Sequence, residues 1–299
     1  NTTGTLNTGI GYSALGANSV DQTGNYNTAL GGFALQNNTT ASSNTAVGYQ
    51  AGYLNTTGSE LTAVGYQAGY GNTTGTENTA VGNNALETNT TGIKNTAVGR
   101  NALNAATTAS NNTAIGRRTL FLNTTGASNT ALGTSALESN TTASNNTAVG
   151  KHAGLSVTTG AGNTLIGSDT GDAITTGQAN TIIGQSAGTN AVNLTTGTGN
   201  VLIGAYVDAA VGTSNDQHGL GYNIQAAANF TTLGNGSNDS RLAFGGTTWS
   251  TISDERVKKD IEDAEAGLSF INDLRPVTFN YKAKGDIPSE FRGYEEGST

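Results

Sequence analysis

The sequence has no cysteine, no methionine, only two prolines and few charged side chains. Without cysteine, neither a disulfide framework nor a thiolate nucleophile is available. Charged residues make up 11% of the chain, whereas an average globular protein has roughly 25%. No apolar run approaches the ~18 residues that a membrane helix needs, so we expect no membrane insertion. Because the first residue is not methionine, we expect further sequence to precede it, where any signal or anchor would lie.

The charges that are present argue against some partners. A net charge of −8 disfavours nucleic acids and anionic membranes, because both repel a negative surface. The charges are also unevenly placed, with 12 of 34 in residues 1–200 and 22 in residues 201–299. Two different kinds of polypeptide therefore meet near residues 200–250.

A short repeat fills the first of these parts. The block NTAVG, with variants, recurs every 17 residues from Asn27 to Asn180, and one interval of 20 residues flanks the series on each side. A strict short period with little charge is typical of a solenoid, and frequent Gly, Asn and Thr disfavour helix. The predicted fold class is an all-β parallel β-solenoid or β-roll of about eleven 17-residue coils.

We expect each coil to contain two short strands, one in NTAVG and one that includes NTT. In the first, the threonine and the aliphatic residue face one way and the alanine faces the other. We expect the aliphatic side chain to fill the coil interior and the alanine to face outward, with asparagine ladders along the stack. The glycine after each strand suits a turn with positive φ. One aliphatic per coil is a thin core, so the alanine row is predicted to pack against copies in a homotrimer.

The repeat units NTAVGYQAGYLNTTG at 44–58 and NTALGTSALESNTTA at 129–143 resemble the head repeats of YadA-type trimeric adhesins. The resemblance covers roughly residues 1–204 and implies a left-handed parallel β-roll. We expect the 17-residue register to end at Val201. Three short alternating segments, HGLGYNI, FTTLG and RLAFGG, then predict a β-rich neck over residues 205–252.

The remaining residues, 253–299, are predicted to form a short α+β piece. Residues 260–274 have apolar residues at helical spacing, and VTFNYK alternates like a strand. The motifs WSTISDERVKKDI and LRPVTFNYK resemble the self-cleaving intramolecular chaperone domain at the C-terminus of endosialidase-type phage tail spikes and related fibres. Residues 253–299 would be the N-terminal part of that domain.

This resemblance implies a function and a site. In that family the chaperone drives trimer assembly of a fibre and then cuts itself off. The cut would fall between Ile252 and Ser253, with Ser253 as nucleophile, Lys258 as its general base, and Asp254 and Arg256 in support. A serine needs an adjacent base to be nucleophilic, and neighbouring cations lower a lysine pKa enough for that role. On spacing alone, the alternative is that Ser253 caps a helix, with Asp254 at its positive end.

The function predicted from these features is a structural, adhesive homotrimeric fibre, a phage tail fibre or spike that contacts a receptor or glycan on the host surface. Its predicted location is the virion tail. The alternative is a trimeric adhesin on a bacterial cell surface. We expect enzyme activity to be at most a single self-cleavage, with no external substrate and no cofactor. No metal site is expected, because His152 and His218 are the only histidines and lie far apart in sequence.

Three local features leave other classes open. A polysaccharide-degrading spike needs paired acids, and Asp169 with Asp172 is the only close acidic pair in the repeats. Threonine ladders would suit an ice- or mineral-binding plane. The tyrosines at one coil position, Tyr12, Tyr49 and Tyr66, stack on sugars or pack between chains.

Overall fold

The computed structural model describes residues 3–16, 22–236 and 238–251. The chain divides into two compact units, Asn1–Ile252 and Ser253–Thr299, and the described residues all belong to the first. Its strands are β1 (Thr8–Ile10), β2 (Thr28–Leu30), β3 (Thr45–Val47), β4 (Thr62–Val64), β5 (Thr79–Val81), β6 (Thr96–Val98), β7 (Thr113–Ile115), β8 (Thr130–Leu132), β9 (Thr147–Val149), β10 (Thr164–Ile166), β11 (Thr181–Ile183), β12 (Val201–Ile203), β13 (His218–Tyr222), β14 (Phe230–Asn235), β15 (Asn238–Ala243) and β16 (Trp249–Thr251).

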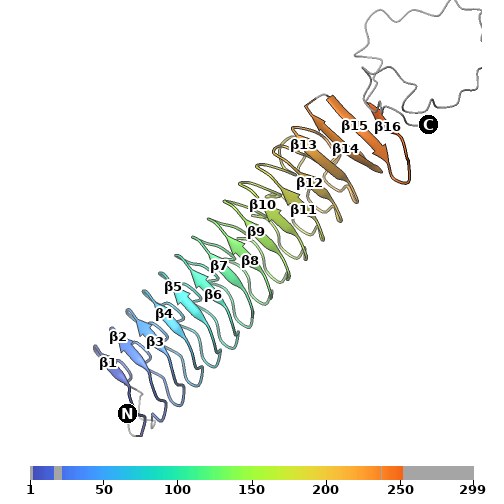
Figure 1. Cartoon of the computed structure of the whole chain (residues 1–299). Helices are drawn as coiled ribbons and strands as arrows, with labels where there is room; N and C mark the ends of the chain where they lie inside the picture. Colours follow the sequence, from blue (N-terminus) through green and yellow to red (C-terminus); the bar gives the residue numbers. More distant parts are fainter. Residues whose placement is uncertain (1–2, 17–21, 237, 252–299) are drawn as a thin grey trace, which may run out of the picture. The chain divides into compact units, whose positions relative to one another are not determined.

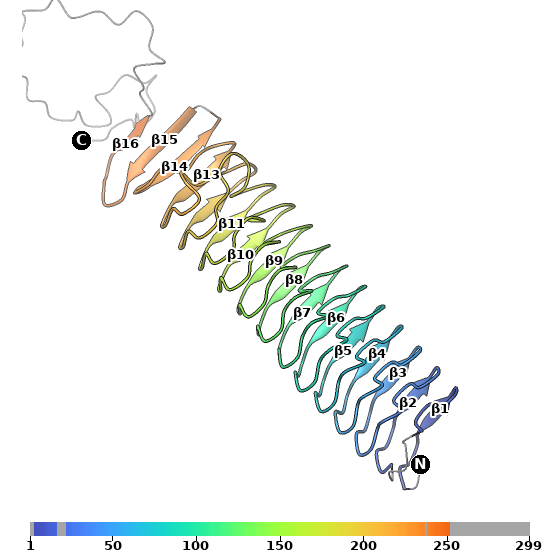
Figure 2. The same cartoon turned by 180° about the vertical axis from the view of Figure 1, so that it is seen from behind.

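These strands form one sheet in sequence order along a single wall of the stack (Figures 1 and 2). Strands β1 to β14 pair in parallel, so thirteen turns connect them, and β14 to β16 pair antiparallel. The predicted parallel β-solenoid with 17-residue spacing is thereby confirmed. The two 20-residue intervals each close one coil, since Thr8 pairs with Thr28 and Thr181 with Val201.

The register continues further than the sequence indicated. Val201 pairs with His218, 17 residues later, and His218 then pairs with Thr231. The expectation that the 17-residue register ends at Val201 is therefore wrong, because coil stacking depends on backbone pairing and not on the letters NTAVG. The three segments predicted to be strands in the neck correspond to β13, β14 and β15.

Each coil of the repeat has one strand and not two. The NTT segment forms bends without strand pairing. Its first threonine still links the coils: the Thr56 hydroxyl donates to the Thr73 carbonyl, and the Thr73 hydroxyl donates to the Thr90 carbonyl. The predicted second strand is wrong because side-chain and backbone bonds to the next coil satisfy this segment without extended geometry.

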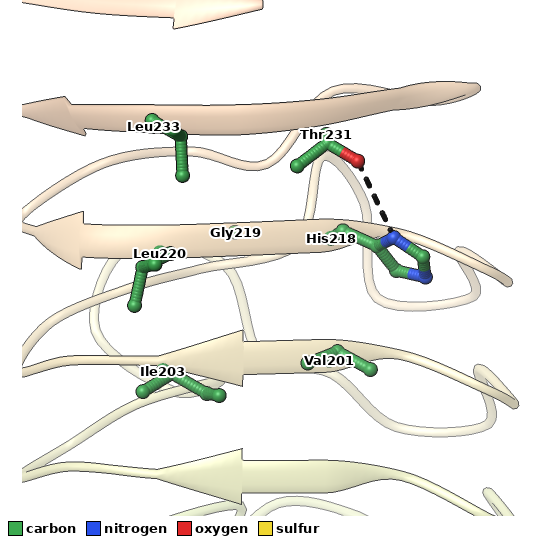
Figure 3. Close-up of a pocket in the computed structure, with 7 residues that line it drawn as sticks. All are labelled: Val201, Ile203, His218, Gly219, Leu220, Thr231 and Leu233. Carbon is green, nitrogen blue, oxygen red and sulfur yellow. Dashed lines mark hydrogen bonds between the residues drawn. The ribbon is translucent and has the colours of Figure 1, made fainter. Parts of the chain in front are cut away.

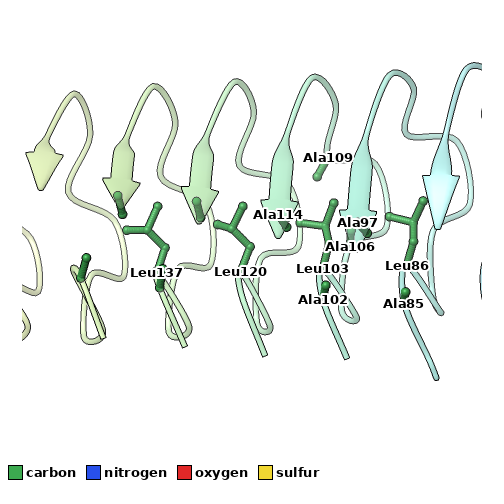
Figure 4. Close-up of a cluster of buried hydrophobic side chains, with 14 of the residues drawn as sticks. Ala85, Leu86, Ala97, Ala102, Leu103, Ala106, Ala109, Ala114, Leu120 and Leu137 are labelled. Carbon is green, nitrogen blue, oxygen red and sulfur yellow. The ribbon is translucent and has the colours of Figure 1, made fainter. Parts of the chain in front are cut away.

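The two faces of the strand are the reverse of the expectation. We number coil positions from the asparagine of NTAVG, so the alanine is position 3 and the aliphatic is position 4. Position 3 is fully buried, as in Ala97 and Ala114, whereas the flanking threonine and aliphatic are partly or largely exposed. The interior is filled from another side of the coil by position 9, and Figure 4 shows Leu86, Leu103 and Leu120 in a row along the stack. In these coils the leucines occupy the central space, so the small alanine fits at position 3. Where position 9 is Gly171 or Gly188, the larger Leu165 or Ile182 is buried at position 3 instead.

Position 9 has a left-handed backbone, faces the coil interior and holds leucine or glycine in the repeats. Leu103 has φ 51° and Gly154 has φ 62°. Leucine fills the interior but is strained in this region, whereas glycine is unstrained but leaves space. Larger side chains fill that space: a Cβ on Gly154 would lie 2.6 Å from Leu165 Cδ1 and 3.3 Å from Val157 Cγ2.

Buried asparagines form two ladders that run along the stack. At position 1, Asn112 Nδ2 donates to Asn95 Oδ1, and Asn129 Nδ2 donates in turn to Asn112 Oδ1. At position 12, Asn140 Nδ2 donates to Asn123 Oδ1 at 2.7 Å. The predicted ladders are confirmed, and they satisfy amides that burial would otherwise destabilise.

The glycine after each strand also has the predicted positive φ. Gly99 has φ 130°, and a Cβ there would lie 2.6 Å from the Gly116 carbonyl oxygen of the next coil. Only glycine permits this backbone and this approach between coils.

Candidate functional site

The predicted cleavage site lies outside the described residues. This holds for Ile252, Ser253, Asp254, Arg256 and Lys258, and also for the helix and strand predicted after them. The described residues instead present surfaces on which a partner can bind.

The most extensive of these surfaces is the outward face of the sheet. We define it as the side chains at positions 2 and 4 of β1 to β14. Position 4 is aliphatic in every one of these strands: Ile10, Leu30, Val47, Val64, Val81, Val98, Ile115, Leu132, Val149, Ile166, Ile183, Ile203, Leu220 and Leu233. Ile10 is 59% exposed, Leu132 45% and Leu220 50%. An aliphatic residue is therefore kept at a solvent-facing position in all fourteen strands.

This face is hollowed at its C-terminal end. A hollow of about 260 Å³ is lined mainly by apolar atoms of Val201, Ile203, Leu220 and Leu233. Figure 3 shows these side chains on one side of β12 to β14, with His218 beside them in hydrogen-bond contact with the Thr231 hydroxyl. The hollow holds no carboxylate, so its chemistry suits an apolar group.

Sequence reasoning missed the outward face because it assigned the position 4 residues to the interior. A signal was present: a second aliphatic, at position 9, recurs in many coils, and the thin coil has room for one large side chain per turn. The alternating sequence of a single strand does not determine which of its two faces is buried.

Aromatic residues gather near the N-terminal end of the stack. Tyr49 stacks on Tyr66 at 5.8 Å between ring centroids, and Tyr53 stacks on Tyr70 at 5.2 Å. Phe33 meets the edge of this group in T-shaped contacts. Stacking covers one face of each ring in a pair, and Tyr49 and Tyr66 remain 46% and 48% exposed. The group therefore combines packing within the chain with exposed aromatic surface.

The acidic pair Asp169 and Asp172 has opposite environments. A hydrogen bond from the Ser168 hydroxyl lowers the pKa of the Asp169 carboxyl, and the His152 ring, 2.9 Å away, acts in the same direction. Burial, followed by repulsion from Asp169, raises the pKa of Asp172. Neither acid lines the hollow on the sheet face, and Asp169 is held by its neighbours in a structural arrangement.

The segment NTAIGRRTLFL at 112–122 departs from the repeat sequence at Arg117 and Arg118 but keeps the regular coil. Leu120 is the regular buried leucine of position 9. The Arg118 guanidinium lies 4.6 Å from the centre of the Phe121 ring and 2.5 Å from Glu138. Its charge is thus engaged within the chain.

A comparison with family models identifies the C-terminal part of the chain. Residues 253–294 match the model described as the chaperone of endosialidase. This match supports the prediction of a chaperone domain in the C-terminal part of the chain. The chaperone segment, residues 253–294, begins at the residue predicted to be the cleavage nucleophile, which is also the first residue of the second compact unit. A comparison with curated proteins and one with solved structures found no match to this chain.

Within residues 3–16, 22–236 and 238–251, no helix has the length and apolar character that a bilayer requires. The same residues bring together no group of three histidine, aspartate or glutamate side chains suited to a metal ion.

Proposed function

We propose that this chain is part of a homotrimeric fibre or spike, a phage tail fibre that contacts the host surface, assembled by its C-terminal chaperone segment. The observation that carries the proposal is the family match at residues 253–294, directly after a long parallel β-solenoid. A solenoid has rigid length and a repeated surface, and contains little that can perform chemistry on an external substrate.

The proposed role of the chaperone segment includes one self-cleavage. Ser253 Oγ attacks the carbonyl carbon of Ile252, and Lys258 accepts the hydroxyl proton. The carbon–nitrogen bond then breaks and the amine of Ser253 takes up a proton. Water hydrolyses the resulting ester, which leaves a carboxylate on Ile252. Asp254 and Arg256 support the site, and the cation of Arg256 favours the neutral form of Lys258.

The intact mass of the protein, expressed from its complete gene, tests this chemistry. The expected result is two fragments divided between Ile252 and Ser253 in the wild type, and one uncut chain for Ser253→Ala and for Lys258→Arg. Ser250→Ala serves as the matched control and is expected to cleave normally. If all four proteins stay whole, the self-cleavage is refuted, and Ser253 is then better explained as a helix cap.

A second candidate is a trimeric adhesin on a bacterial cell surface, favoured by the similarity of the repeats to YadA-type heads. The domains encoded on either side separate the two: a virion-attachment domain upstream supports the phage fibre, and an outer-membrane anchor downstream supports the adhesin.

A further inference from the structure

We infer that the outward face of the sheet, positions 2 and 4 of β1 to β14, is the surface through which copies of this chain contact one another. This inference rests on the proposed self-associating fibre and specifies which surface makes the contact. It replaces the alanine row, which the structure buries inside the coil.

The first support is the uniform chemistry of the face. All fourteen strands place an aliphatic side chain at position 4, although none of these is needed to fill the coil interior. At position 2 the side chain is threonine in twelve strands, and Val201 and His218 occupy the other two. An apolar stripe of this length, with no carboxylate, lysine or arginine, is unusual for a surface that stays in water.

The second support is the contrast with the rest of the coil. The ion pairs of the repeats lie at other positions, as shown by Lys94 with Glu77 and Arg118 with Glu138. Charge is therefore excluded from the sheet face but tolerated on the turns. Depletion of charge at the centre of a surface is a feature of protein interfaces.

The third support is the size of the face. Thirteen spacings of about 4.8 Å and a width of three residues at about 3.3 Å give an area of roughly 600 Å² per chain. This is about three quarters of the ~800 Å² that each partner contributes to a standard interface. In a bundle of three parallel chains, the three faces surround a common axis and each chain meets both others.

The spacing of the face favours another copy over an unrelated protein. A partner that covers the whole stripe must present apolar groups every ~4.8 Å over its length. A second copy of this chain has that spacing along its own outward face, because each of its strands contributes one aliphatic side chain. The hollow at β12 to β14 then receives aliphatic side chains of the neighbouring copies.

The absence of cysteine allows a direct test with single cysteine variants of the full chain. Leu132→Cys places a thiol on the outward face of β8. Thr142→Cys places one on the exposed NTT segment of the same coil. In parallel chains around one axis, equivalent residues meet, so mild oxidation is expected to link Leu132→Cys chains into dimers and to leave Thr142→Cys chains unlinked.

The second test is the mass of the native oligomer. We expect the wild type and Leu132→Thr to have the mass of three chains, and Leu132→Lys to have the mass of one chain. Because this side chain points away from the coil interior, circular dichroism should show that the lysine variant remains folded.

The outcomes separate the inference from the proposed function. The inference is overturned if the wild type is a trimer but Thr142→Cys chains link, Leu132→Cys chains do not, and Leu132→Lys still forms trimers. That result would remain consistent with the proposed trimeric fibre. A wild-type chain that remains monomeric at every concentration overturns both, and the face would then serve another partner.

Discussion

The position 12 ladder is interrupted, and repairing it should stabilise the protein. Asn89 Oδ1 is buried without a hydrogen-bond partner, because the next coil has Ala106 where an asparagine would donate. One coil further on, Asn123 Nδ2 donates only to the Gly126 carbonyl. The change Ala106→Asn is therefore expected to join the two separate ladders.

Another coil shows that an asparagine fits this position. There, Leu137 occupies position 9, Asn140 position 12 and Ala143 position 15, and Asn140 donates to the Ala143 carbonyl. The coil of Ala106 has the same residue types at positions 9 and 15. The new side chain would donate to Asn89 Oδ1 and to the Ala109 carbonyl, and would accept from Asn123 Nδ2.

The magnitude follows from these bonds. Three new hydrogen bonds at about 0.5–1.5 kcal/mol each are partly offset by about 1 kcal/mol for ordering the side chain. The expected gain in the free energy of unfolding is about 0.5–3.5 kcal/mol, with a central value of about 2 kcal/mol. Urea denaturation followed by circular dichroism measures it, with the exposed Thr108→Ala as a control that should change the stability by less than about 0.5 kcal/mol.

The change Val157→Asn is a useful comparison with Ala106→Asn. It offers a donor to Asn140 Oδ1, which is the unsatisfied acceptor at the end of the second position 12 ladder. The next coil has Ile174 at position 12, so the unsatisfied oxygen would only move by one coil. Val157 also fills the space beside Gly154. We expect this change to destabilise by about 1–3 kcal/mol. The reasoning is refuted if Ala106→Asn destabilises the protein, or if both changes have the same sign.

Three other changes test other parts of the coil. Asn112→Ala leaves the buried backbone N–H of Asn129 without its acceptor, so we expect a loss of about 2–4 kcal/mol in denaturation; a loss below about 1 kcal/mol would contradict the ladder's role. Gly99→Ala places a Cβ 2.6 Å from the Gly116 carbonyl oxygen at φ 130°, so a loss above about 3 kcal/mol, or no folded protein by circular dichroism, is expected. Burial raises the pKa of Asp172, so its ionised form is disfavoured in the folded state; Asp172→Asn should raise the melting temperature at pH 7, and the difference should disappear below about pH 3.9, where the carboxyl is protonated in both states.

Much of the fold could be read from the sequence, because a solenoid repeats its local structure in its letters. The period of NTAVG placed the strands from Thr28 to Ile183, and the following glycine identified the turn. The asparagines of position 1 predicted a ladder, since stacked coils bring identical residues together. The motif at Ser253 pointed to the chaperone family before any comparison, and the match at residues 253–294 agrees with it.

Only the tertiary structure decided which face of the strand is inside. Alternation in a strand separates Ala97 from Val98, but it does not state which of the two is covered. Leu103, five residues after Val98, settles the question, because its side chain already occupies the coil interior. That competition for a small volume is a property of the closed coil and not of the strand, so the outward apolar stripe became visible only once the chain was folded.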